Sequence, residues 1–213
     1  MISGHISQQD RAIALLREQG MARLSEFVGA GITAATISRM KERGLLLRLG
    51  RGLYQLPDAP FDAHHALAEA AKLVPNGVIC LASALAYHEL TDTIPREVWM
   101  AIGPKDRRPK REERLAIVRF GPKVFSAGIE ERKIEGVAVR LFNPAKTVVD
   151  LFRYRRSSGK SYRRSPGLNL ALEGMREALR QRKATPAEIA RFAEEAGVWT
   201  AMRPYLEAMT ANA

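Results

Sequence analysis

Apolar residues near the start of the chain recur with a helical period. Residues 8–19 place Ala12, Ile13 and Leu16 on one face, and Gly20 follows as a stop signal. A short helix is predicted for residues 24–28, ending at a glycine pair.

A third helix is predicted immediately afterwards. Thr33 is expected to be its N-cap, Ile37 and Met40 share one face, and Gly44 stands where a left-handed residue closes a helix. The chain then has two β-prone runs, residues 45–49 and 53–56, separated by a turn rich in glycine. Three helices followed by a hairpin is the element order of a winged helix-turn-helix.

Beyond Pro57 the spacing of apolar residues predicts both helices and strands. Pro57, Asp58, Ala59 and Pro60 form a connector. The remaining predicted elements are helices and strands in this order: helix 61–73, strand 78–81, a helix capped by Ser83, strands 98–102, 115–120 and 136–142, and helices 146–154, 168–182, one capped by Thr185, and 198–209. The predicted fold class is therefore α+β, with a winged helix-turn-helix over residues 1–57 and a mixed domain over residues 58–213 that has a small sheet and C-terminal helices.

Composition and charge favour a polyanionic partner. The net charge is +11, divided as +4 over residues 1–57, +1 over 58–150 and +6 over 151–213. The longest apolar stretch, residues 78–87, is too short to span a membrane, and the opening residues do not have the pattern of a secretory signal, so a cytoplasmic protein is expected. The single cysteine, Cys80, cannot form an internal disulfide and is expected to be a small buried residue.

The outward face of the third predicted helix carries the candidate DNA contacts. At 100° per residue, Ala35, Ser38, Arg39, Glu42 and Arg43 project away from the apolar face. Ala35 is suited to a thymine methyl, Ser38 to a base or phosphate, and Arg39 to guanine, while Arg43 is suited to phosphate.

The tip of the predicted hairpin is also cationic. Arg51 lies between two glycines that permit close approach to DNA, and with Arg48 it is expected to bind phosphate or to enter a minor groove. The alternative is an ordinary surface helix with solvated arginines. The complete predicted DNA-binding set is Thr33, Ala35, Thr36, Ser38, Arg39, Arg43, Arg48 and Arg51.

These residues carry a resemblance to a known family. The run GITAATISRMKERGLLLRLGRGLYQLP resembles the winged helix of the AbiEi antitoxins of type IV (AbiE) toxin–antitoxin and abortive-infection systems. The segment over residues 78–102 and the run VRLFNPAKTVVDLFR resemble later parts of that family, so the resemblance covers about residues 8–155. It implies a regulator that represses its own operon, and an antitoxin that neutralises a toxin with a nucleotidyltransferase fold.

A second basic segment interrupts the C-terminal half. It contains two tyrosines and no acidic residue, so it is predicted to be a loop in the free protein. It either contacts nucleic acid or an acidic partner, or is only solvated. Its cations are Arg153, Arg155, Arg156, Lys160, Arg163 and Arg164. The basic stretch 104–114 is interleaved with acids and is predicted to be a turn between strands.

Enzymatic signals are weak. His64 and His65 diverge on a helix, and Cys80 and His88 have no further ligands near them in sequence, so neither pair predicts a metal site. The pairing of Asp106 with Glu131-Arg132-Lys133 resembles the acidic and Glu-x-Lys pattern of metal-dependent nucleases. No cofactor, metal or catalytic residue is predicted.

The favoured interpretation is a non-enzymatic, sequence-specific transcriptional regulator that binds a double-stranded DNA operator, with an antitoxin role implied by the resemblance. Two alternatives stay open: a protein-interaction module in which the winged helix is vestigial, and a metal-dependent nuclease. The expected partners are the operator and a cognate nucleotidyltransferase-like toxin, acting functionally or by direct contact, and no membrane.

Overall fold

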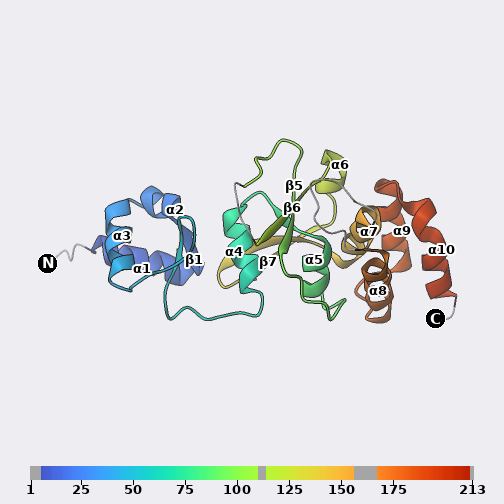
Figure 1. The fold of residues 1–213 in the computed structure, drawn as a ribbon, viewed down its shortest axis with the longest axis horizontal. Helices are drawn as coiled ribbons and strands as arrows, with labels where there is room; N and C mark the ends of the chain where they lie inside the picture. The colour runs from blue at the N-terminus through green and yellow to red at the C-terminus, as the bar shows by residue number, and fades with distance from the viewer. Residues whose placement is uncertain (1–5, 110–113, 156–166, 212–213) are drawn as a thin grey trace. The chain divides into compact units, whose positions relative to one another are not determined.

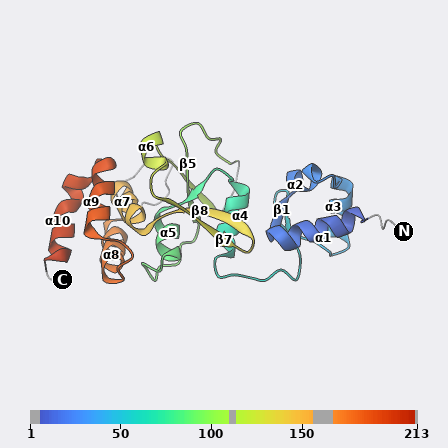
Figure 2. The same cartoon turned by 180° about the vertical axis from the view of Figure 1, so that it is seen from behind.

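A computed structural model describes residues 6–109, 114–155 and 167–211. The chain forms two compact units, one made of residues 1–75 and 133–139 and the other of residues 76–132 and 140–213. The ribbon views show the elements of each unit (Figure 1 and Figure 2). Whether residues 1–57 alone form a separable domain stays a prediction.

The first unit has the element order of a winged helix-turn-helix, as predicted. Strand β3 lies between β1 and β2 and is antiparallel to both. Strand β1 was not predicted, because three residues are too few to show an alternating pattern. The elements are α1 Gln8–Gln19, β1 Met21–Arg23, α2 Leu24–Gly29, α3 Ala34–Glu42, β2 Leu47–Gly50, β3 Leu53–Gln55 and α4 His65–Leu73.

The ends and the apolar face of α3 explain its position. The hydroxyl of Thr33 accepts a hydrogen bond from the backbone N–H of Thr36, which caps the helix as predicted. Ile37 and Met40 are buried in a core that includes Leu16 of α1 and Phe27 of α2. The apolar stripe predicted from the sequence is therefore the buried face.

A turn from far along the chain packs against the end of α1. Residues Glu135 and Gly136 join β7, Ile129–Ile134, to β8, Val137–Phe142, and both have positive φ, as in a type I′ hairpin turn. A Cβ atom added to Gly20 would lie 1.6 Å from the carbonyl oxygen of Glu135. The backbone of the turn therefore occupies the space that any side chain at position 20 would need.

The same turn also holds the segment before α4. The Glu135 carboxylate accepts a hydrogen bond from the backbone N–H of Asp62 at 2.6 Å and contacts Nδ1 of His65 at 2.8 Å. The ring of His65 stacks on Phe61 with 4.8 Å between centroids. Residues distant in sequence thus contribute to the packing of the N-terminal unit.

The larger sheet is mixed and has five strands in the order β6-β5-β4-β8-β7, and it belongs to the second unit apart from residues 133–139 of its last two strands. Strand β4 pairs with β5 antiparallel and with β8 parallel, whereas β5 and β6 are parallel. Residues 104–114 lie between β5 and β6, as predicted for a segment between strands, and because the two strands are parallel they cannot be joined by a tight hairpin turn. The remaining strands are β4 Val78–Ile79, β5 Val98–Ile102 and β6 Leu115–Arg119.

Two local expectations for this unit are corrected. Helix α5, Leu81–Tyr87, begins after Cys80, so Ser83 lies inside it and is not its N-cap. The Ser83 hydroxyl instead accepts from the backbone N–H of Trp99 at 2.9 Å and joins the helix to β5. The short helix α6, Pro122–Phe125, and strand β7 were not among the predicted elements.

Helix α7, Pro144–Tyr154, lies at the centre of the second unit. It packs against α5, α8 and α9, and both ribbon views show it between the sheet and helices α9 and α10 (Figure 1 and Figure 2). Asn143 caps it by accepting from the backbone N–H of Lys146. The surrounding helices are α8 Gly167–Arg180, α9 Pro186–Glu195, with its predicted Thr185 cap, and α10 Trp199–Thr210.

A buried ion pair lies on α7. Lys146 donates a short hydrogen bond to Asp150, and its ammonium lies 4.4 Å from the ring centroid of Phe142. Burial raises the pKa of Asp150 to about 6, although the Lys146 charge opposes that shift, and burial lowers the pKa of Lys146. Removal from water therefore dominates the electrostatics of both groups.

Among the described residues, no helix is both long and apolar enough to cross a lipid bilayer.

Replacing Gly20 tests the packing of the hairpin turn. Gly20→Ala should lower the free energy of unfolding by about 3 kcal/mol, because alanine is strained at φ +69° and its methyl group would collide with the Glu135 carbonyl. Gly29→Ala is the matched control, since nothing lies within 4 Å of its added Cβ. The control should change stability by no more than about 1 kcal/mol. Equal denaturation midpoints for the two variants in urea would contradict the contact.

Replacing one member of the buried ion pair should be more harmful than replacing both. Lys146→Met leaves the Asp150 carboxylate buried without its cation and should lower the free energy of unfolding by about 3 kcal/mol at pH 7. The double variant Lys146→Met/Asp150→Leu should be closer to wild type in the same urea titration. A double variant less stable than Lys146→Met would refute this interpretation.

The pair also predicts a pH dependence. The pKa of Asp150 is about 6 in the folded chain against an ordinary value of 3.8, so the folded state binds this proton more tightly. Its contribution to stability is complete below pH 3.8 and is lost as the pH rises through about 6. The wild type should therefore gain stability relative to the double variant between pH 7 and pH 5.

Candidate nucleic-acid interface

The outward face of α3 is open to solvent. Ala35, Ser38, Arg39, Glu42 and Arg43 are all exposed. On the opposite face, Ile37 is 0% and Met40 2% exposed. The structure thus places the five predicted outward residues on one accessible surface.

Two residues of this surface pair with each other. The Ser38 hydroxyl donates to the Glu42 carboxylate at 3.1 Å. An exposed carboxylate also lowers the positive electrostatic potential of this face, so Glu42 disfavours contact with a DNA phosphate. In the major groove, its carboxylate is suited to accept a hydrogen bond from the amino group of a cytosine.

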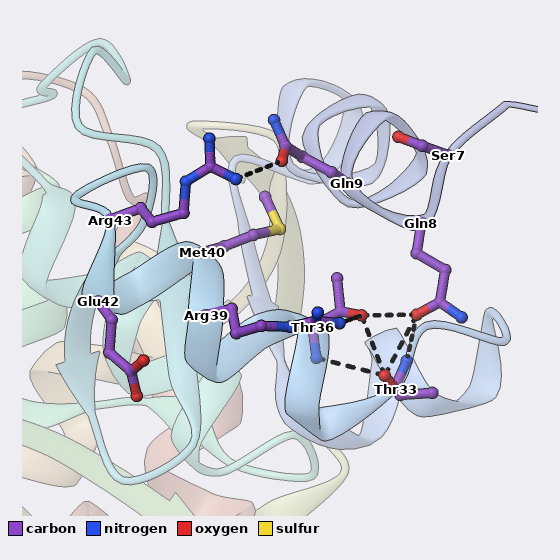
Figure 3. A pocket seen from close by; sticks show the side chains of 9 residues that line it. All are labelled: Ser7, Gln8, Gln9, Thr33, Thr36, Arg39, Met40, Glu42 and Arg43. Atoms are coloured by element: carbon purple, nitrogen blue, oxygen red, sulfur yellow. Dashed lines mark hydrogen bonds between the residues drawn. The ribbon is translucent and has the colours of Figure 1, made fainter.

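Thr36 does not belong to the exposed face. It is 9% exposed, and its hydroxyl donates to Oε1 of Gln8 at 2.8 Å. Figure 3 shows this hydroxyl directed towards α1. Its inclusion in the predicted DNA-binding set is therefore corrected: at 100° per residue, position 36 lies beside Met40 on the buried side.

The amide of Gln8 connects α1 with the start of α3. Its Oε1 accepts from both the backbone N–H and the hydroxyl of Thr33, at 3.0 and 3.2 Å. Thr33 remains exposed, but its polar atoms are used within the protein. Gln8 was not predicted to take part, because nothing in a helical pattern shows that a glutamine in the first turn reaches residues 25 positions later.

Arg39 of α3 and Arg43, the C-cap residue that follows it, rest on neutral acceptors around a hollow between α1 and α3 (Figure 3). Arg39 donates to the Thr36 hydroxyl and Arg43 to Oε1 of Gln9, each at the long distance of 3.4 Å. Long bonds to uncharged oxygens are weak. Both guanidinium groups are therefore positioned without being neutralised.

The hairpin of β2 and β3, residues 47–55, is the wing of this fold, and it carries the two arginines predicted as DNA contacts. Arg48 and Arg51 are exposed, and Nε of Arg48 donates to the carbonyl of Gly50 at 3.1 Å. Gly52 has φ +69°, which only glycine adopts without strain. The pairing of β2 with β3 shifts register between Arg48 and Gly50, so the wing carries a bulge.

The second basic segment is only partly within the described residues. Helix α7 extends through Tyr154, so Arg153 is helical and partly buried, with its guanidinium 5.8 Å from the ring centroid of Phe120. Arg155 donates to the carbonyl of Phe152. Arg153 therefore belongs to the helix predicted over residues 146–154, which α7 confirms. Four of its predicted contacts lie outside the described residues: Arg156, Lys160, Arg163 and Arg164.

The candidate chemical groups do not assemble into a metal site. Within residues 6–109, 114–155 and 167–211, no cluster of three or more His, Cys, Asp or Glu side chains is arranged to hold a metal ion. Asp106 accepts from the backbone N–H of Gly103 at 2.7 Å, which is a turn contact. Cys80 is buried, as predicted, and its burial raises the pKa of the thiol, which disfavours the reactive thiolate.

Comparison with known families supports the resemblance for the N-terminal segment. Residues 10–57 match the model of a family described as "Transcriptional regulator, AbiEi antitoxin". The match extends from α1 through β3 and so contains the exposed face of α3 and the wing. No curated protein matches the chain.

The link between Gln8 and Thr33 can be tested by a double-mutant cycle. Thr33→Ala removes the cap of α3 and should lower the free energy of unfolding by about 1 kcal/mol. Because Gln8 bonds to the same hydroxyl, Gln8→Ala and Thr33→Ala should show a coupling energy of about 0.5 kcal/mol or more. Strictly additive effects in urea titrations would mean that the two residues act independently.

Proposed function

We propose, from the match of residues 10–57 to the AbiEi regulators, that this chain is a sequence-specific DNA-binding transcriptional regulator. The observation that carries the proposal is the exposed face of α3, with Arg39 and Arg43 available on a helix whose other face is buried. In a helix-turn-helix protein this helix enters the major groove. The wing then lies against the neighbouring DNA backbone.

The roles of the residues follow from their reach. Ala35 is short enough for the helix to approach base edges, and its methyl group suits the methyl group of thymine. Arg39 lies one turn further along and is long enough to donate two hydrogen bonds to guanine. Arg43, near the end of the helix, is suited to a phosphate.

The proposal extends to the biology implied by the family. The regulator would repress its own operon and act as the antitoxin of a type IV toxin–antitoxin system, in the cytoplasm. Its second partner would be a nucleotidyltransferase-like toxin, neutralised functionally or by contact with residues 58–213. The proposal assigns no catalytic role to the chain. The support for this part is the match to a family of antitoxins and regulators.

Two arginine variants separate base recognition from backbone binding. Arg39→Ala should weaken binding to the operator by about 1 to 3 kcal/mol and relax discrimination at one base pair. Arg51→Ala should weaken binding to all sequences to a similar extent. Fluorescence anisotropy with the DNA upstream of the gene and with random-sequence duplexes measures both effects.

Arg17→Ala provides the matched control, because Arg17 is exposed on α1 and lines neither hollow of the winged helix. It should alter both affinities only slightly. Equal losses on operator and random DNA for Arg39→Ala would refute its role in base recognition. Absence of salt-sensitive binding to any duplex by the wild type would refute the proposed function itself.

A further inference from the structure

Three arginines from three separate positions line a second hollow of the winged helix. Arg23 is the last residue of β1, Arg48 lies in β2, and Arg51 occupies the turn before β3. All three border the same hollow, together with Ser25 and Tyr54. Only two of the three arginines were predicted as DNA contacts, since Arg23 is 25 residues away from Arg48 in the sequence.

Backbone hydrogen bonding brings these positions together. Strand β3 pairs with β1 on one side and β2 on the other, with Arg23 opposite Leu53 and Arg48 opposite Tyr54. The backbone N–H of Leu24 donates to the carbonyl of Gly52 at 2.7 Å. This bond fixes the residues after β1 against the wing turn, so the convergence is a property of the fold.

Among the described residues, no ion pair involves the side chains of Arg23, Arg48 or Arg51. Two acids lie near this part of the small sheet. Glu26 is held by Lys72 at 2.8 Å and by the backbone N–H of Arg23 at 2.6 Å, and a Cβ atom added to Gly50 would lie 3.8 Å from Oε1 of Glu69. Three cations bordering one hollow repel each other unless an anion lies between them.

Two neutral side chains complete the lining. Ser25 is exposed, and its hydroxyl can donate to an anion. The ring of Tyr54 packs edge-on against the buried Phe27, with 6.2 Å between centroids, which holds the tyrosine in place. Forked guanidinium groups with hydroxyl donors beside them are the chemistry that binds phosphate.

We infer that this hollow binds a phosphate of the DNA backbone, held by Arg23, Arg48 and Arg51 together. The wing then acts as a clamp on the backbone and does not read the minor groove. Arg51 is confined to this role because its neighbours in the hollow are cations and hydroxyl groups that favour the same anion. The inference rests on the proposed function, since it names how the same protein holds DNA.

Arg23→Gln is the decisive variant, because position 23 lies outside both the recognition helix and the wing. Binding to a random-sequence duplex is measured over a series of salt concentrations. The variant should bind about tenfold more weakly at low salt. The slope of log K against log salt should fall by about 0.9, as expected for one lost phosphate contact. Arg17→Gln, which removes the same charge from the exposed surface of α1, should leave the slope nearly unchanged.

A second measurement separates the backbone from the minor groove. Arg51→Gln should weaken binding equally on duplexes with an A-tract and on duplexes rich in G·C, because a phosphate contact carries no sequence information. A larger loss on A-tract DNA, where the minor groove is narrow and attracts arginine, would overturn the inference.

The possible failures are distinguishable. If the wild type binds DNA and Arg39→Ala loses discrimination, but Arg23→Gln behaves like Arg17→Gln, the phosphate site is refuted and the proposed function stands. If no duplex is bound, the proposed function fails. Urea denaturation of Arg23→Gln shows whether a loss of DNA affinity comes from unfolding of the variant. In that case the double variant Ser25→Ala/Tyr54→Phe, which removes two hydroxyl groups of the hollow and no charge, is used in the same DNA-binding measurement. An unchanged affinity of a folded double variant would refute the participation of these two hydroxyl groups.

Discussion

The burial of one face of α3 is the constraint on which the proposed interface depends. Ile37 and Met40 lie in a core that α1 and α2 share, and transferring two such side chains from water stabilises the fold by about 1.5 to 3 kcal/mol each. A helix held in this way has no freedom to rotate about its axis. The residues at the opposite angles, including Arg39 and Arg43, are therefore exposed as a consequence of packing.

Hydrogen bonds at the N-terminus of α3 add precision to this arrangement. Gln8 binds Thr33 and Thr36 with a single amide oxygen, so the first turn of α3 is tied to the first turn of α1. The turn at Glu135 and Gly136 supports the other end of α1 by occupying the space beside Gly20. Both ends of α1 are thus fixed by contacts that lie far apart in the sequence.

The predictable features were those with a local physical cause. Helices α1, α3 and α9 were found because apolar spacing, Thr33, Thr185 and the flanking glycines act within a few residues. Strand β1 was missed because its existence depends on pairing with β3, and the parallel pairing of β5 with β6 is likewise invisible in either strand. Ser83 was predicted to be an N-cap because serine occurs both at N-caps and inside helices, where its hydroxyl bonds to other groups.

The sequence could predict those site residues whose exposure depends only on their angle around the helix axis. That angle correctly separated Arg39 from Ile37, and it also places Thr36 on the buried side. It gave no information about Gln8 or Arg23, because their positions beside α3 and the wing arise from the tertiary fold. Functional residues on separate elements become neighbours only when the sheet and the core are formed.

Some arginine side chains of the second unit have carboxylate partners, and this bears on function. Arg132 and Arg180 pair with carboxylates at 2.6 Å, whereas Arg119 donates to backbone carbonyls. In the described part of the first 57 residues, no arginine side chain has a carboxylate partner, and those with hydrogen bonds use carbonyl, amide or hydroxyl oxygens. An ion pair would have to be broken before its cation could bind DNA, whereas a neutral acceptor positions the cation and leaves its charge intact. The winged helix therefore holds these arginine side chains in place and leaves their charges available to an anion. A basic surface that is only solvated does not require such hydrogen bonds.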